Sequence, residues 1–130
     1  MGVPVELRHG VDIVEVKRIA QMFAEHGDAF WTRCFTAAER EYCEQSKKRC
    51  YEHAAARFAA KEAVMKALGT GLADGLSWTN VEVVRDERGA PVVNLAGQAI
   101  AASRQLGIRH WAISLSHTEN YAIASVIATG

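Results

Sequence analysis

Four charged residues lie close together in one Ala-rich segment, RFAAKEAVMKALGTG, at residues 57 to 71. Arg57 and Lys61 carry like charges, whereas Glu62 and Lys66 carry opposite charges. On a helix the members of each pair lie about 40° apart, and the two pairs lie about 140° apart. The simplest interpretation is two surface pairs, of which only Glu62 and Lys66 attract each other. The alternative is that an anion lies near Arg57 and Lys61 and offsets their repulsion.

A further carboxylate, Asp12, follows Gly10 at the end of a predicted strand, with apolar neighbours on both sides. A carboxylate in this position either forms a turn at the end of a strand or binds a hard cation. Mg²⁺ takes one or two protein carboxylates and completes its shell with water and phosphate oxygens. Asp12 and Glu62 would supply such a pair, although spacing alone does not connect two positions so far apart.

Two short polar motifs complete the candidate chemistry. Gly69-Thr70-Gly71 follows its predicted helix, whereas phosphate loops of the Walker and Rossmann types precede a helix. The motif is better read as a helix cap whose backbone can approach a ligand closely. His117 and Thr118 follow a predicted strand, where a histidine is either a solvated turn residue or a functional group.

The elements that must position these residues begin with a strand at residues 3–14 and a helix from Glu15 to about Gly27. Apolar residues recur at helical spacing in the latter segment. Thr36 and Glu39 form a capping-box pattern that predicts the start of a second helix. A third helix is expected from about Tyr51 to Leu68, with Gly69 as its left-handed cap.

The remainder of the chain has β character, interrupted by one short helix. WTNVEVVRD and PVVNLAG flank a turn at residues 86–89 and predict a hairpin. A helix is expected over QAIAASRQLG, which ends at Gly107. WAISLSHT and YAIASVIA alternate around residues 119–120 and predict a second hairpin. The sequence therefore predicts an α+β fold with helices packed on a small antiparallel sheet.

Length and composition restrict the class of protein. We expect residues 1–130 to form a single domain. Fifteen basic and fifteen acidic residues balance, which argues against a nucleic-acid partner. Only the cluster at residues 47–49 favours such a partner, and a solvated helix end explains it more simply. We also expect no membrane span and no secretory signal. The three cysteines form no CxxC pair, which is typical of reduced thiols in a cytoplasmic protein.

Five segments together resemble one family: GVDIVEVKRI, FTAAERE, RFAAKEAVMKALGTG, RDERGAPVV and SLSHTENYAIASVI. Their order and spacing are similar to those of the holo-acyl-carrier-protein synthases, the small bacterial-type 4′-phosphopantetheinyl transferases. The resemblance extends from about Gly10 to Ile127. It implies a 4′-phosphopantetheinyl transferase-like fold that forms trimers, with the coenzyme A site between subunits.

The resemblance also implies an activity. The family transfers the 4′-phosphopantetheine arm of coenzyme A to a serine of apo acyl carrier protein and releases adenosine 3′,5′-bisphosphate. The reaction depends on Mg²⁺ and supports fatty acid biosynthesis. By motif matching, Asp12 and Glu62 would be the metal ligands, and Lys66 would contact the diphosphate. These three residues would carry the catalysis, with either Glu62 or a water molecule taking the serine proton.

The remaining matched positions concern binding. The backbone at Gly69 and Gly71 would lie along the ligand, and Arg18 would dock the acidic carrier protein. The residues that would face the 3′-phosphoadenosine are Arg49, Arg57, Pro91, His117 and Thr118. In a trimer, the two pairs of charges on the central helix would serve two neighbouring sites.

The sequence departs from the family pattern at a few positions. Arg8 stands where the family often has the first glycine of G-x-G-x-D, and Met65 stands where many relatives have a smaller residue. Glu25 and Asp28 place negative charge near the expected docking helix, which leaves open a specialised carrier, such as one of polyketide synthesis. A catalytically silent coenzyme A-binding module is the alternative outside enzymes, and the presence of Asp12, Glu62 and Lys66 argues against it.

Overall fold

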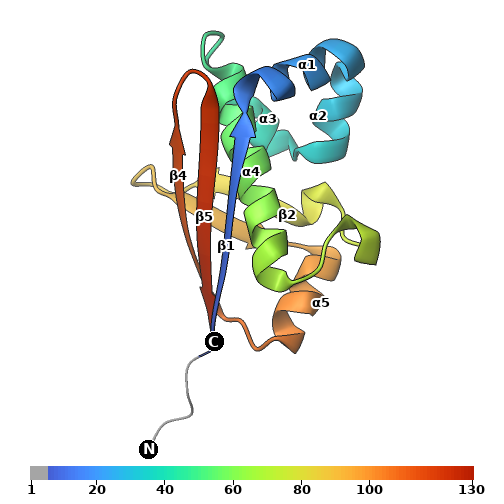
Figure 1. The fold of residues 1–130 in the computed structure, drawn as a ribbon, viewed down its shortest axis with the longest axis vertical. Helices are drawn as coiled ribbons and strands as arrows, with labels where there is room; N and C mark the ends of the chain where they lie inside the picture. Colours follow the sequence, from blue (N-terminus) through green and yellow to red (C-terminus); the bar gives the residue numbers. More distant parts are fainter. Residues whose placement is uncertain (1–5) are drawn as a thin grey trace, which may run out of the picture.

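The computed structural model describes residues 6–130. Its central element is α4 (Cys50–Leu68), which lies behind a three-stranded sheet (Figure 1). Helices α1 (Val16–His26), α2 (Asp28–Cys34) and α3 (Ala37–Glu44) lie near one end of α4, and α5 (Gly97–Gln105) lies near the other. The central helix is buried on most of its circumference, because it also packs against α1, α3 and β2. This explains why its sequence is rich in alanine.

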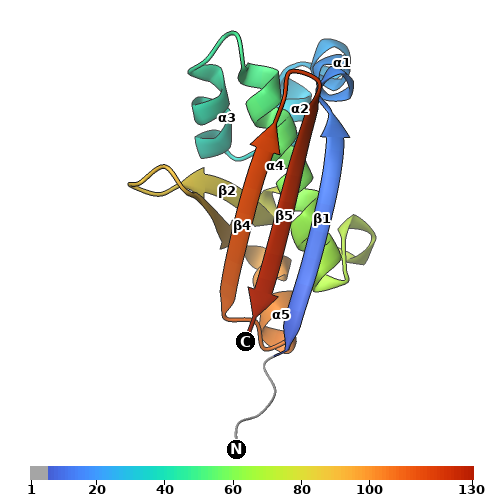
Figure 2. The ribbon, with the colours of Figure 1, turned by 60° about the vertical axis from the view of Figure 1, so that its left-hand side comes forward.

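The three-stranded sheet is antiparallel and has the order β1-β5-β4 (Figure 2). Its strands are β1 (Leu7–Glu15), β4 (His110–His117) and β5 (Tyr121–Thr129). The register pairs Asp12 with Ala124 on the neighbouring strand. Alternate residues of β5 face α4 and are fully buried, as period-two patterning requires: Ala122, Ala124, Val126 and Ala128.

Strand β1 and helix α4 touch through their backbones. A Cβ atom built on Gly10 would lie 1.9 Å from the carbonyl oxygen of Ala63, so no side chain fits there. Only glycine allows this approach between the strand that carries Asp12 and the helix that carries Glu62.

The second sheet consists of β2 (Val81–Arg85) and β3 (Pro91–Leu95) in an antiparallel hairpin. The expected turn is present: Asp86 Oδ1 accepts hydrogen bonds from the backbone N–H groups of Arg88 and Ala90 at 2.8 and 3.0 Å. The expected single sheet is therefore wrong for the described residues, which form two separate sheets. Hydrogen bonds join β4 to β5 but not to β3.

Short helices connect these parts. The segment after α4 contains two 3₁₀ turns, η1 (Leu72–Asp74) and η2 (Trp78–Asn80), and α5 (Gly97–Gln105) follows the second hairpin strand. At the other end lie α1 (Val16–His26), α2 (Asp28–Cys34) and α3 (Ala37–Glu44).

Helix α2 was not expected from the sequence. It packs Phe30 and Trp31 against Phe23 of α1, with ring centroids 4.7 and 4.4 Å apart. The other expected elements are present, with ends shifted by a few residues. Residues 3–5 of the first expected strand lie outside the described residues. None of the helices in residues 6–130 is long and apolar enough to cross a membrane.

Candidate active site

Asp12 and Lys66 form a direct contact between β1 and α4. Lys66 Nζ lies 3.1 Å from Asp12 Oδ1 and also donates to the carbonyl oxygen of Val11 at 2.9 Å. The Asp12 side chain is 19% exposed and that of Lys66 is 54% exposed. The structure thus brings together two groups that stand far apart in the sequence, and the lysine is accessible to a ligand.

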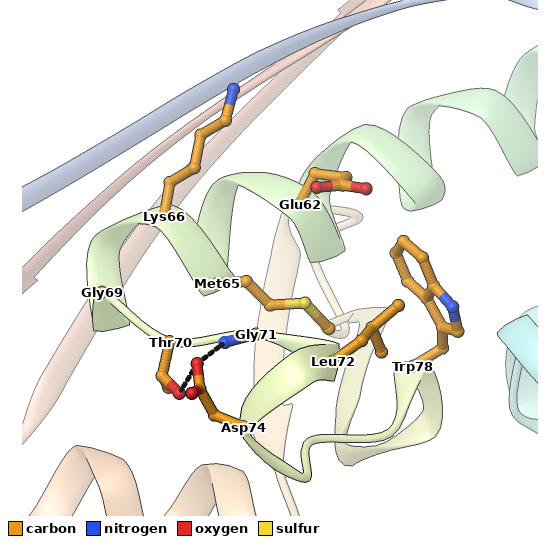
Figure 3. A pocket seen from close by; sticks show the side chains of 9 residues that line it. All are labelled: Glu62, Met65, Lys66, Gly69, Thr70, Gly71, Leu72, Asp74 and Trp78. Carbon is orange, nitrogen blue, oxygen red and sulfur yellow. Dashed lines mark hydrogen bonds between the residues drawn. The ribbon is translucent and has the colours of Figure 1, made fainter.

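Glu62 lies one helical turn before Lys66, so both side chains leave α4 on the same side (Figure 3). Partial burial raises the pKa of Glu62, and the negative charge of Asp12 raises it further, while Lys66 and Arg18 act in the opposite direction. The two carboxylates are therefore close enough to repel each other. A divalent cation between them would relieve this repulsion.

The donor set fits a hard cation with few protein ligands. Within residues 6–130, no group of three or more His, Cys, Asp or Glu side chains is placed to hold a metal ion. Mg²⁺ suits a pair of carboxylates, because it keeps several waters and binds phosphate oxygens. The chemistry of Asp12 and Glu62 is thus compatible with Mg²⁺.

A hollow of about 400 Å³ opens beside Glu62 and Lys66. Gly69 has a positive φ of 71°, as expected for a left-handed helix cap, and the chain then turns along the edge of this hollow. Figure 3 shows the lining residues, which are Glu62, Met65, Lys66, Gly69, Thr70, Gly71, Leu72, Asp74 and Trp78. Met65, Leu72 and Trp78 form the apolar end of the hollow, and its charged lining residues are Glu62, Lys66 and Asp74.

A second hollow of about 570 Å³ lies at the opposite end of α4. His117 Nδ1 lies 2.9 Å from Glu52 Oε1. Thr118 Oγ1 accepts hydrogen bonds from two backbone N–H groups of the β4–β5 turn, those of Asn120 and Tyr121. Arg49, His117 and Thr118 all line this hollow, together with Val16, Lys48, Tyr51, Glu52 and Glu119. Three of the five residues expected to face 3′-phosphoadenosine therefore lie together.

The other two, Arg57 and Pro91, do not line either hollow. Arg57 is 1% exposed and its guanidinium stacks on Tyr42, with the carbon Cζ 4.1 Å from the ring centroid. Its Nε has no hydrogen-bond partner among the described residues. Arg85, which pairs with Pro91 across the hairpin, lies over the same ring at 5.3 Å.

The expected surface pair of Arg57 and Lys61 is wrong, because both side chains are buried. Lys61 Nζ lies 2.8 Å from Glu39 Oε1, and neither side chain is exposed. The ammonium group also donates to the carbonyl oxygens of Trp78 and Val81. The Ala-rich helix is covered on this side by α3 and β2, which the angles on a helical wheel do not reveal.

Arg18 lines a third hollow, of about 310 Å³, between α1, α2 and the segment after α4. Two arginines, Arg18 and Arg33, line this hollow together with apolar residues that include Met22 and Phe58. Leu72 and Trp78 line this hollow and the first one, so the two adjoin. Sequence reasoning missed Leu72, Asp74 and Trp78. Leu72 and Trp78 could have been found from the sequence, because they are large apolar residues in a loop of mostly small ones.

Comparison with known proteins gives a consistent result. The profile of the 4′-phosphopantetheinyl transferase superfamily matches residues 8–126. A holo-[acyl-carrier-protein] synthase of Koribacter versatilis (strain Ellin345) is 52% identical over 118 residues, which cover 91% of this chain and 94% of the relative. That of Geobacter sp. (strain M21) is 48% identical with the same coverage.

Solved structures of similar proteins agree in fold. The holo-(acyl-carrier-protein) synthase of Bacillus anthracis str. Ames, in complex with CoA (3′,5′-ADP), has a TM-score of 0.77 at 34% identity, with 95% of this chain and 96% of the other covered. The holo-[acyl-carrier-protein] synthase of Neisseria meningitidis has a TM-score of 0.82 at 34% identity, with 93% and 96% covered.

Proposed function

Because the chain belongs to the 4′-phosphopantetheinyl transferase superfamily, we propose that Asp12, Glu62 and Lys66 form its transfer site. The protein is a holo-[acyl-carrier-protein] synthase, which moves the phosphopantetheine arm of coenzyme A to a serine of an acyl carrier protein. The observation that carries the assignment of the site is the contact of Lys66 with Asp12, one helical turn from Glu62.

Asp12 and Glu62 would hold Mg²⁺. The ion, when bound, would neutralise charge on the diphosphate of coenzyme A. Burial raises the pKa of Glu62, and the charge of Asp12 raises it further. A bound cation would offset the repulsion between the two carboxylates, which supports this role. Both carboxylates must be ionised to bind the ion.

In the reaction, the serine oxygen attacks the phosphorus atom that bears the pantetheine arm, and the bond from that phosphorus to the bridging oxygen breaks. Lys66 Nζ would donate to the bridging oxygen and the 5′-phosphate oxygens of the departing adenosine 3′,5′-bisphosphate, which become more negative in the transition state. Its 54% exposure supports this role, because a buried ammonium group could not reach a ligand. Either Glu62 or a water molecule would take the serine proton.

The pantetheine arm would leave the diphosphate past the apolar end of the first hollow, over Met65, Leu72 and Trp78. The carrier protein would dock at the adjoining third hollow, where Arg18 and Arg33 complement an acidic partner. Leu72 and Trp78 line both hollows, so donor and acceptor would meet beside them.

The active site would lie between subunits of a homotrimer. Arg49 and Lys66 stand at opposite ends of α4, about 25 Å apart at the rise of an α-helix. In coenzyme A a single ribose links the diphosphate to the 3′-phosphate, so one bound molecule cannot reach both residues of the same chain. We therefore propose that Lys66 of one subunit and Arg49 of its neighbour bind the same coenzyme A, with His117 and Thr118. Arg57 and Pro91 would belong to the neighbour's part of this site, behind the residues that contact coenzyme A.

The outer face of the three-stranded sheet supports assembly. It carries a row of exposed apolar side chains, of which Leu7 and Ile13 are 62% and 63% exposed. The other members are Val11, Tyr121, Ile123 and Ile127. An apolar face of this kind on a protein of this size is typical of a subunit interface.

A mixed-subunit experiment tests the shared site. Glu62→Ala and Arg49→Ala proteins, each inactive alone, are unfolded, mixed in equal amounts and refolded. With random assembly, about a quarter of the sites contain both an intact Glu62 and an intact Arg49. About a quarter of the wild-type activity should therefore return. Light scattering should give the mass of three chains. An inactive mixture of trimers would exclude sites shared in this way.

The activity itself is tested by incubating the protein with coenzyme A, Mg²⁺ and an apo acyl carrier protein. The carrier should gain the mass of phosphopantetheine, and a chelator should prevent the gain. Asp12→Ala and Glu62→Ala should lower the rate by about 10³-fold, since each removes a metal ligand. Glu41→Ala, which removes an exposed helical glutamate, is the matched control. Wild-type rates in the Asp12 and Glu62 variants would refute the assignment of the site.

We also propose that residues 1–130 act as one domain in the cytoplasm. The three cysteines of the described chain are free, and burial raises the pKa of the Cys43 thiol to about 12, which keeps it unreactive.

A fatty-acid carrier is the proposed substrate. Asp28 is neutralised in part by Arg40 at 2.8 Å, which reduces its repulsion of an acidic carrier. Rates on a panel of fatty-acid and polyketide carriers would distinguish the two substrates.

A further inference from the structure

The segment Gly69-Thr70-Gly71 is contacted from two sides by charged residues that have no place in the chemistry described so far. Arg8 of strand β1 lies beside Gly69, where a built Cβ atom would stand 3.3 Å from Arg8 Nη2. Asp74 of the 3₁₀ turn η1 binds Thr70 and Gly71, as Figure 3 shows. We call residues 69–71 the glycine loop. Both contacts are independent of the Asp12, Glu62 and Lys66 cluster, although all lie around the same end of α4.

Arg8 binds the end of the helix from which the loop begins. Its Nε donates to the carbonyl oxygen of Ala67 at 2.6 Å, a group that lacks an intrahelical partner at a helix end. One of its terminal nitrogens, Nη2, lies 3.3 Å from the point where a Cβ on Gly69 would stand. The guanidinium therefore lies directly against the left-handed residue that turns the chain out of the helix. Its positive charge also suits the negative end of the helix dipole.

Asp74 folds the other half of the loop. Its Oδ2 accepts a hydrogen bond from Thr70 Oγ1 at 2.8 Å and one from the backbone N–H of Gly71 at 3.2 Å. The backbone N–H of Asp74 donates in turn to the carbonyl oxygen of Gly71 at 2.9 Å. A glycine-rich segment has many accessible conformations, so these bonds select one of them.

We propose that Arg8 and Asp74 are positioning residues that hold the glycine loop in the conformation that receives the coenzyme A diphosphate. This inference rests on the proposed function and on the expectation, from the family resemblance, that the backbone of Gly69 and Gly71 lies along the ligand. Neither residue needs to touch the substrate. Each acts through the loop: Arg8 fixes where it starts, and Asp74 fixes the orientation of Thr70 and Gly71.

The two residues have opposite charges, which separates positioning from simple electrostatics. If charge alone mattered, loss of Arg8 would weaken the binding of an anionic diphosphate and loss of Asp74 would strengthen it. If both residues hold the loop, either loss weakens binding. The sign of the effect of Asp74→Ala is therefore the decisive measurement.

The experiment compares the steady-state kinetics of Arg8→Met, Asp74→Ala and the wild type, with coenzyme A varied at saturating carrier protein. We expect the KM for coenzyme A to rise about five- to tenfold in both variants while kcat changes less than about twofold. Asp74→Asn keeps an acceptor oxygen without the charge, and Arg8→Lys keeps the charge, so both should recover part of the loss. Arg104→Met and Glu87→Ala remove exposed charges elsewhere and should leave KM unchanged.

Two further readouts do not depend on activity. Amide hydrogen exchange at residues 69–71 should become faster in both variants, and calorimetry should show weaker binding of coenzyme A. A lower KM for Asp74→Ala, or unchanged exchange in the loop, would overturn the proposal. A wild-type protein that binds coenzyme A but modifies no carrier would instead contradict the proposed function, and the exchange and binding measurements would still test the loop.

Discussion

Replacing Lys61 by methionine would remove one member of a fully buried ion pair and keep most of the side-chain volume. Lys61 Nζ lies 2.8 Å from Glu39 Oε1 and has two carbonyl partners, and both side chains are 0% exposed. Burial lowers the pKa of Lys61, whereas the charge of Glu39 acts in the opposite direction. The variant leaves the Glu39 carboxylate buried without its counter-charge.

The magnitude follows from what remains around Glu39. Breaking a buried pair by removing one partner costs about 3–5 kcal/mol. Glu39 keeps hydrogen bonds from the backbone N–H groups of Thr36 and Val83, each at 2.8 Å, which stabilise its charge. We therefore expect a loss near the lower end, about 3 kcal/mol, or a fall in the melting temperature of about 10 °C for a chain of this length.

Urea denaturation followed by circular dichroism measures this loss, with all proteins at one concentration because assembly also contributes to stability. The double variant Lys61→Met/Glu39→Gln leaves no unpaired charge but can accept only one of the two backbone N–H bonds of Glu39, so it should recover only part of the loss of Lys61→Met. Lys61→Arg keeps the positive charge but is larger, and it should also be less stable than the wild type, since an arginine does not fit the site of a lysine bound on three sides. A loss below about 1 kcal/mol for Lys61→Met would refute the reasoning, because it would mean that the pair is not charged in the folded protein.

Three further predictions concern other positions. Glu62 has a raised pKa, so its contribution to stability is present below its ordinary pKa of 4.5 and is lost as pH rises through the raised value. At neutral pH, Glu62→Gln should therefore have a higher melting temperature than the metal-free wild type, whereas near pH 4 the two melting temperatures should be equal. The variant should show no transferase activity. A lower melting temperature of the variant at neutral pH would contradict the predicted direction of the effect. Gly10→Ala places a methyl group against the Ala63 carbonyl and should lower the free energy of unfolding, measured in urea, by about 3 kcal/mol. It should also lower activity, because it moves Asp12. Wild-type stability of the variant would show that the strand can shift freely. Thr36→Ala loses the N-cap and should cost about 1–2 kcal/mol, whereas Thr36→Ser should cost little; equal losses would assign the effect to the methyl group.

Local signals predicted much of the fold. Thr36 and Glu39 form the complete capping box, with the Glu39 carboxylate 2.8 Å from the backbone nitrogen of Thr36. Gly69 ends α4 in the left-handed conformation, and the turn at residues 86–89 joins two strands. These features involve residues within a few positions of one another, so their physics is contained in short stretches of sequence.

Features that depend on distant partners could not be predicted in this way. Glu39 was recognised as a cap, but its pairing with Lys61 requires α3 to cover α4, which no local pattern states. Helix α2 begins after Gly27 without a side-chain cap, and its seven residues are too few to show a clear period. The contact of Asp12 with Lys66 was not predicted, and only the family resemblance placed the two residues in one site beforehand. The trimer and the individual ligand roles remain predictions.

The pairing of β1 with β5 affects when the active site can form during synthesis, because it joins the first strand to the last. Asp12 lies opposite Ala124, and within the described residues β5 is the only strand hydrogen-bonded to β1. A nascent chain therefore holds both carboxylates, Asp12 and Glu62, long before residues 121–129 leave the ribosome and fix the first strand against α4. Contacts between positions so distant in sequence slow folding, because the intervening chain must first be ordered. We expect the metal ligands to reach their final positions only at the end of folding, so a chain shortened before β5 would contain every catalytic residue and no active site.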